Sequence, residues 1–110
     1  MSTKQMTEML KGTLEGVVLA LLRGQPAYGY EITTMLREMG FADIVEGTVY
    51  ALLIRIEQKG LVDVDKRPSE KGPPRKVYSL NARGEQELTE FWTTWSFLSD
   101  RLEQLRVREG

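Results

Sequence analysis

The chain has 110 residues, of which 41% are hydrophobic and 28% are charged, values typical of one globular domain with an apolar core. It contains no cysteine and no histidine, which excludes disulfides, thiolate nucleophiles and a Ser-His-Asp triad, so we expect neither an enzyme, a cofactor nor a metal site. The formal net charge is −1, no apolar run approaches the roughly 20 residues that cross a bilayer, and the first residues lack a signal peptide's apolar stretch, so we expect a cytoplasmic protein.

Apolar residues between positions 6 and 22 recur at intervals of three and four, which is the pattern of an amphipathic helix. They are Met6, Leu10, Leu14, Val17, Val18, Leu21 and Leu22. We predict one continuous helix over this segment. Gly24 and Pro26 end it, because glycine relaxes a helix end and proline cannot continue a helix.

Two shorter helices follow. Tyr28-Gly29-Tyr30 opens the first, and Gly40 ends it. Thr48 is the predicted N-cap of the second, and Gly60 ends it. The buried face of this second helix follows the i, i+3, i+4, i+7 rule and consists of Val49, Leu52, Leu53 and Ile56. The opposite face is neither strongly charged nor apolar, which is unusual for a solvated helix, and carries Ala51, Ile54 and Gln58, flanked by Tyr50, Arg55 and Lys59.

A hairpin and a long helix complete the chain. Residues 61–65 and 76–80 read as two short strands, and the loop between them is rich in turn formers and basic residues. Asn81 then caps a helix that runs to about Arg106. The order α-α-α-β-β-α predicts a mostly helical α+β fold, the winged helix-turn-helix, whose third helix enters the DNA major groove. We expect residues 1–80 to form this DNA-binding domain and residues 81–110 a dimerisation helix, as one structural unit.

Basic charge is concentrated in the middle third of the chain. Residues 54–84 carry eight basic and four acidic side chains, whereas residues 1–53 have a net charge of −2 and residues 85–110 a net charge of −3. Phosphate binding depends on local potential rather than on the charge of the whole chain. The middle third is therefore either a nucleic-acid-binding surface or a solvated basic face.

The final helix carries a heptad seam of large apolar residues. Its members are Leu88, Phe91, Trp95, Leu98, Leu102 and Leu105. Trp92 and Phe97 lie beside the seam, and Met6, Met9 and Leu10 of the first helix are placed to complete the same interface. Because so small a body offers little to cover the stripe, we expect the same helix of a second copy to do so, giving a twofold-symmetric homodimer. Such a dimer holds two recognition helices about 34 Å apart, one turn of the DNA duplex.

Several motifs, in order and in register over residues 10–88, resemble the PadR family of transcriptional regulators. They are Leu10-Lys11-Gly12-Thr13-Leu14-Glu15, Tyr28-Gly29-Tyr30-Glu31, Glu46-Gly47-Thr48-Val49-Tyr50, Arg55-Ile56-Glu57-Gln58-Lys59-Gly60-Leu61, and Gly72-Pro73-Pro74-Arg75-Lys76-Val77-Tyr78-Ser79-Leu80-Asn81, followed by Gly84 and Leu88. The resemblance implies a dimeric repressor whose third helix and hairpin wing bind operator DNA. By motif position it implies DNA-binding roles for Thr48, Tyr50, Arg55, Gln58 and Lys59 on the helix and for Lys71, Arg75 and Lys76 on the wing.

The roles of these side chains differ. We expect the three lysines to contact phosphates, which position a protein on DNA without reading sequence, and Arg55 to contact either a phosphate or a guanine edge. Tyr50 either donates a hydrogen bond to a phosphate or packs against the wing or the second helix. Arg75 either serves the wing's DNA contact or pairs with a carboxylate such as Asp65 across the hairpin.

Two positions depart from the family pattern. The family often has proline at the position of Ala51 and a basic residue at the position of Ile54. Ile54 either contacts a thymine methyl group in the major groove or is a locally altered packing residue.

The single C-terminal helix resembles the short members of the family, such as the lactococcal multidrug-binding regulator, some of which bind flat aromatic compounds between tryptophans at the dimer interface. Trp95 falls at the corresponding position, so Phe91, Trp92 and Trp95 form the candidate site for a small planar aromatic effector. In the alternative interpretation the tryptophans only pack the interface.

We therefore predict a sequence-specific, homodimeric DNA-binding repressor. The alternative is a winged-helix module that binds protein or ligand and has no affinity for DNA.

Overall fold

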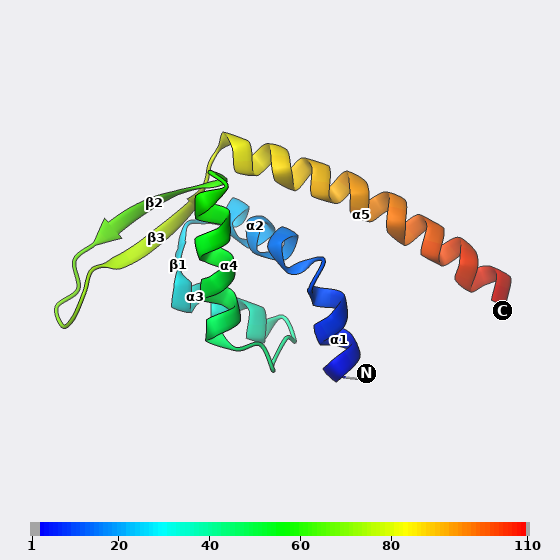
Figure 1. Cartoon of the computed structure of the whole chain (residues 1–110), viewed down its shortest axis with the longest axis horizontal. Helices are drawn as coiled ribbons and strands as arrows, with labels where there is room; N and C mark the ends of the chain where they lie inside the picture. The colour runs from blue at the N-terminus through cyan, green and yellow to red at the C-terminus, as the bar shows by residue number, and fades with distance from the viewer. Residues whose placement is uncertain (1–2, 110) are drawn as a thin grey trace.

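The computed structural model describes residues 3–109, which form five helices and three strands (Figure 1). In chain order these are α1 (Thr3–Leu10), α2 (Leu14–Gly24), β1 (Ala27–Tyr28), α3 (Gly29–Glu38), α4 (Glu46–Gln58), β2 (Val62–Arg67), β3 (Arg75–Leu80) and α5 (Ala82–Glu109). This mostly helical architecture with a small antiparallel sheet and a long last helix confirms the predicted winged helix-turn-helix fold. Within the described residues, no helix is both long enough and apolar enough to span a membrane.

The predicted continuous helix over residues 6–22 is wrong, because the structure breaks it at Lys11-Gly12-Thr13 into α1 and α2. The Thr13 hydroxyl donates a hydrogen bond to the carbonyl oxygen of Met9 at 3.1 Å, and the Thr13 amide donates to the carbonyl of Leu10. Glycine is entropically costly in a helix interior, and the adjacent β-branched threonine is also a weak helix former. These local preferences end α1 although the apolar spacing continues across the break.

Helices α3 and α4 are each followed by a glycine that ends the helix. After each helix a glycine adopts a positive φ, +107° at Gly40 and +74° at Gly60. The next amide then donates back to the last turn, from Phe41 to the Leu36 carbonyl and from Leu61 to the Ile56 carbonyl, an arrangement that favours glycine at the left-handed position.

The start of α4 differs from its prediction. Helix α4 begins at Glu46 with Val45 as the flanking residue, so Thr48 lies inside the first turn and is not the N-cap. An acidic side chain in this first turn is favourable for a helix terminus that exposes unpaired amide groups. That contribution favours a helix that begins three residues earlier than an N-cap at Thr48 indicates.

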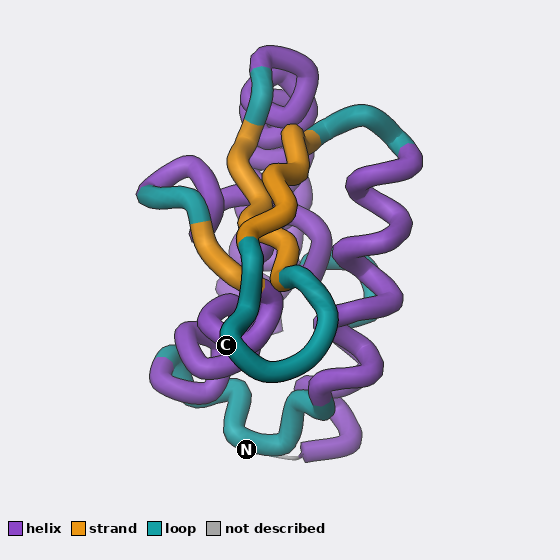
Figure 2. Tube along the Cα trace, turned by 90° about the vertical axis from the view of Figure 1, so that its left-hand side faces the viewer, coloured by secondary structure: helices purple, strands orange, loops and turns teal. Residues whose placement is uncertain are grey.

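The sheet has the strand order β1-β3-β2, and all its pairings are antiparallel. Strands β2 and β3 confirm the predicted hairpin and extend it to Arg67 and Arg75. Strand β1 was not predicted, because two residues are too few for an alternating pattern; it pairs Ala27 with Tyr78 and Tyr28 with Val77. Figure 2 shows the β2–β3 loop as an open arc that projects beyond the sheet.

The core joins α2, α3, α4, the sheet and the start of α5. The four residues predicted for the buried face of α4 are all buried, which confirms that face. The first part of α5 is fixed by two close approaches: Gly84 lies against the Leu61 carbonyl, and the Phe91 ring fills the space beside Gly16. Asn81 is the N-cap of α5 as predicted, since its Oδ1 accepts a hydrogen bond from the Gly84 amide at 2.9 Å. Beyond this anchored part, the rest of α5 projects away from the body (Figure 1).

Candidate nucleic-acid interface

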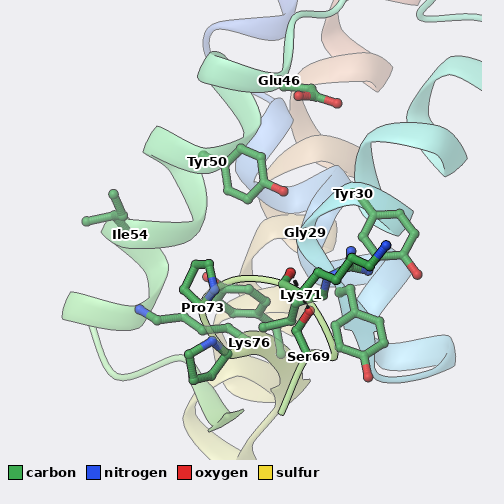
Figure 3. A pocket seen from close by; sticks show the side chains of 13 residues that line it. Gly29, Tyr30, Glu46, Tyr50, Ile54, Ser69, Lys71, Pro73 and Lys76 are labelled. Carbon is green, nitrogen blue, oxygen red and sulfur yellow. Dashed lines mark hydrogen bonds between the residues drawn. The ribbon is translucent and has the colours of Figure 1, made fainter. Parts of the chain in front are cut away.

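A groove of about 870 Å³ lies between the outer side of α4, the start of α3 and the β2–β3 hairpin (Figure 3). All four tyrosines of the chain line it, namely Tyr28, Tyr30, Tyr50 and Tyr78. The hairpin contributes three of the predicted DNA-binding residues to the same groove: Lys71, Arg75 and Lys76. The fold therefore brings the predicted recognition helix and the predicted wing together along one surface.

The outer face of α4 carries the predicted helix residues. Thr48, Tyr50, Arg55, Gln58 and Lys59 are all exposed. Within residues 3–109, the Arg55 guanidinium has no ion-pair partner. This face is consequently available for contact with another molecule.

Tyr50 packs against the second helix of the predicted helix-turn-helix. A Cβ atom at Gly29 would lie 2.5 Å from the Tyr50 ring, so only glycine fits beneath the ring at the start of α3. Figure 3 shows the ring extending from α4 toward Gly29 and Tyr30. Tyr50 therefore packs against the start of α3, while its ring also remains exposed along the groove.

The wing is joined to α3 by a stack of aromatic and cationic groups. The Arg75 guanidinium carbon lies 5.3 Å from the centroid of the Tyr30 ring, and the Tyr30 and Tyr28 rings stack with centroids 5.6 Å apart and an interplanar angle of 12°. Such cation–π contacts orient a guanidinium as well as stabilise it. Because Tyr28 also belongs to β1, the stack links the start of α3 to the hairpin.

The alternative pairing of Arg75 with Asp65 is not observed. In the sheet register Asp65 faces Val77, two positions away from Arg75 along the strand. The Asp65 carboxylate instead accepts a hydrogen bond from Arg67 on its own strand, at 3.5 Å. The register of β2 and β3, which the sequence pattern does not reveal, therefore determines that Asp65 does not face Arg75.

Two of the predicted phosphate-binding lysines form ion pairs within the chain. Lys76 Nζ lies 3.2 Å from a Glu57 carboxylate oxygen of α4, and Lys59 Nζ lies 2.9 Å from a Glu15 carboxylate oxygen of α2. Both pairs are substantially exposed, and exposed ion pairs contribute little stability. These lysines can therefore exchange a carboxylate for a phosphate at small cost.

Like charges face one another on the outer half of the hairpin. Lys66 lies opposite Lys76, and Arg67 lies opposite Arg75, in the register of β2 and β3. Like charges directly across a strand pair are destabilising. Sequence reasoning did not assign Lys66 and Arg67 to the DNA-binding set, and the strand register is the signal that reveals their role in this basic surface.

The floor of the groove is apolar. Tyr78 is buried beneath the wing, and burial raises the pKa of its phenol, an effect that the nearby ammonium group of Lys76 opposes. Within residues 3–109, no group of three or more acidic side chains is placed to hold a metal ion. The groove thus combines basic edges with an aromatic floor.

The predicted seam on α5 divides into two parts. Leu88 is only 3% exposed and lies in the core of the chain itself, which corrects its assignment to an intersubunit seam, and Phe91 is half-buried against α2. The other members project beyond the body and are between 41% and 53% exposed: Trp95, Leu98, Leu102 and Leu105. The face that packs on α2 therefore continues as an uncovered apolar stripe.

The aromatic residues beside the seam lie on different sides of α5. Trp92 is exposed and makes an edge-to-face contact with Phe91, with centroids 5.2 Å apart. Phe97 is covered by the Arg101 guanidinium, 4.2 Å from its ring centroid. On α1, Met6 and Leu10 line an apolar cavity of about 340 Å³ next to Phe41 and Ile44, while Met9 is exposed.

The sequence and the fold are both similar to known regulators. A family model described as the transcriptional regulator PadR-like family matches residues 18–90. A crystal structure of a Streptococcus transcriptional regulator is 44% identical, with 89% of this chain and 96% of that chain covered and a TM-score of 0.79. A PadR-like transcriptional regulator from Bacillus cereus is 37% identical, with coverage of 89% and 95% and a TM-score of 0.78.

A PadR family transcriptional regulator from Eggerthella lenta is 33% identical to this chain, with 93% of this chain and 88% of that chain covered and a TM-score of 0.84. The segment that the family model matches contains α3, α4, the hairpin and the anchored first part of α5. The similarity therefore extends over all the elements that form the groove.

Proposed function

The chain belongs to the PadR-like family of transcriptional regulators, and we propose that it represses transcription as a homodimer bound to a specific operator. Family membership makes it a DNA-binding regulator and not an enzyme. Repression, dimerisation and control by an effector are the parts that we propose.

One observation carries the proposal most directly, namely the like-charge register of the hairpin. The Lys66–Lys76 and Arg67–Arg75 pairs each place two like charges directly opposite each other on a two-stranded ribbon, an arrangement that is destabilising. Binding of an anionic partner replaces this repulsion with a favourable electrostatic contact. Duplex DNA is such a partner, because phosphates are spaced regularly along its backbone.

In the proposed complex, the outer face of α4 lies in the major groove and the wing contacts the adjacent backbone. Lys59, Lys71 and Lys76 contact phosphates, and Arg55 contacts a phosphate or a guanine edge. Thr48, Tyr50 and Gln58 are also exposed on α4 and complete the contact set. Arg75 is held over Tyr30 and sets the direction of the wing.

The proposed homodimer forms through the projecting part of α5. Four large apolar side chains continue the face that packs on α2 but lie beyond the body of the chain, with Trp95 and Leu98 in the middle of the molecule's longest element. A helix from a second copy covers such a stripe in a twofold arrangement. Residues 1–80 then act as the DNA-binding domain and residues 81–110 as the dimerisation helix.

The proposed effector is a small planar aromatic compound that stacks on Trp95, Trp92 and Phe91 at the dimer interface. The exposure of both tryptophans and the edge-to-face contact between Phe91 and Trp92 support it. Quenching of tryptophan fluorescence by a series of planar cationic dyes tests the idea. Quenching no stronger than that of free tryptophan would leave the two rings with a packing role alone.

A salt titration of DNA binding tests the proposed function. The logarithm of the binding constant is expected to fall linearly with the logarithm of salt concentration. Arg55→Ala is expected to weaken binding while sedimentation velocity still reports a dimer, because Arg55 is exposed on α4 and does not belong to the apolar stripe of α5. A protein that binds no duplex at any salt concentration would instead be the alternative winged-helix module for protein or ligand.

A further inference from the structure

The centre of the outer face of α4 carries no charge. Gly47, Ala51, Ile54 and Gln58 follow one another at intervals of four, three and four, so they form one stripe opposite the buried face of the helix. All four are exposed, and Ile54 is 53% exposed. Ile54 is therefore not part of the core.

The flanks of the stripe differ from its centre. Arg55 borders it on one side, and the basic wing borders it on the other, across the groove that Ile54 also lines. A molecule that complements this surface of α4 is therefore anionic at two edges and apolar between them. The major groove of DNA has this form, with two phosphate backbones and, at each A·T pair, the thymine methyl group between them.

We infer that Ile54 is a specificity-determining residue that packs against a thymine methyl group in each operator half-site. Gly47 has no side-chain carbon and Ala51 has only a methyl group, which allows α4 to approach the base edges closely. Ile54 is the largest apolar group in the stripe. The inference rests on the proposed function and adds to it a named base feature. Removal of one methyl group from an apolar contact is expected to weaken binding about fourfold.

Replacement of thymine by deoxyuridine tests this contact, because it removes only the methyl group. An operator is first selected from a random duplex pool with the full-length protein, and each of its thymines is then replaced in turn. For the wild-type protein, at least one replacement in each half-site should raise the dissociation constant about fourfold. The Ile54→Ala variant should bind the unmodified operator about as weakly as the wild type binds the modified one. For this variant, the same thymine replacement should have no effect on the dissociation constant.

Val107→Ala is the matched control, since Val107 is also an exposed apolar residue on a helix but lies near the end of α5. It should retain the full deoxyuridine penalty. Equal penalties in the wild type and Ile54→Ala at every thymine, with both proteins still binding the operator, would overturn the inference and leave the proposed function intact. Failure to select any duplex would overturn the proposed function itself and the inference with it.

Discussion

Arg67 and Arg75 face each other across the β2–β3 ribbon, with their backbones in direct register. Each side chain also makes one other contact. Arg67 forms an ion pair with the Asp65 carboxylate, and the Arg75 guanidinium lies over the Tyr30 ring. The register nevertheless keeps two like charges directly opposite each other, an arrangement that is destabilising in strand pairs. In our account, folding tolerates this repulsion because DNA binding uses both charges.

Arg67→Gln should therefore change stability and DNA binding in opposite directions. The change removes the like-charge repulsion and also the exposed ion pair with Asp65, which contributes little, so the free energy of unfolding should rise by at most about 1 kcal/mol. The same change should weaken operator binding and reduce the slope of binding against salt by about one. Thermal unfolding and a salt series measure the two effects. Arg108→Gln removes an exposed charge from α5 and should alter neither, whereas unchanged binding by Arg67→Gln would remove the hairpin from the DNA-binding surface.

Tyr30→Ala should weaken DNA binding through the position of the wing. Without the ring, the Arg75 guanidinium loses its stacking surface and the hairpin loses a link to α3. Because Tyr30 is exposed, unfolding measurements should show a change below about 1 kcal/mol, the size of an exposed cation–π contact. Tyr30→Phe keeps the ring and should restore most of the affinity. Equal loss in both variants would assign the effect to the hydroxyl group instead.

Leu98→Asp should abolish the dimer and reduce operator affinity with it. The charge would lie in the middle of the uncovered stripe, where the proposed partner helix removes it from water. Sedimentation velocity should report a monomer. The circular dichroism spectrum should be unchanged, which shows that the variant is folded. Val107→Asp introduces the same charge on the opposite side of α5 and should remain dimeric. A dimeric Leu98→Asp protein would place the interface elsewhere.

The free energy of unfolding should decline at alkaline pH because of Tyr78. Burial raises the pKa of its phenol, so the folded state favours the neutral form. This contribution is fully present below the ordinary tyrosine pKa of about 10 and is lost as pH rises through the higher pKa of the folded state. Denaturant unfolding between neutral and alkaline pH should therefore show a smaller decline for Tyr78→Phe. Equal declines for both proteins would mean that ionisation of Tyr78 is not coupled to unfolding.

Local patterns in the sequence were sufficient for much of the fold. The buried face of α4 and the Asn81 cap depend on residues within one or two helical turns, and both were predicted correctly. The break between α1 and α2 was missed because Leu10 and Leu14 keep helical spacing across it. Apolar periodicity reports which side of a segment is buried, and it does not report a turn that keeps the spacing.

The contacts of the candidate interface depend on residues far apart in the chain. Lys59 pairs with Glu15, 44 positions away, and Arg75 stacks on Tyr30, which no local pattern links to it. Leu88 shares the heptad spacing of the exposed stripe, and only the docking of α5 on the body separates it from Leu98. Motif positions predicted which elements form the groove, whereas tertiary packing determined the partners of each side chain.

A gel shift with the duplex that lies immediately upstream of the protein's own reading frame tests whether the protein binds a specific operator, because regulators often control their own genes. A scrambled duplex of the same composition is the control, and both are measured at low and at moderate salt. Retardation of the upstream duplex should persist at moderate salt, while retardation of the scrambled duplex should be lost. Failure to retard either duplex at low salt would contradict the account, because the basic wing and α4 should bind any DNA under that condition.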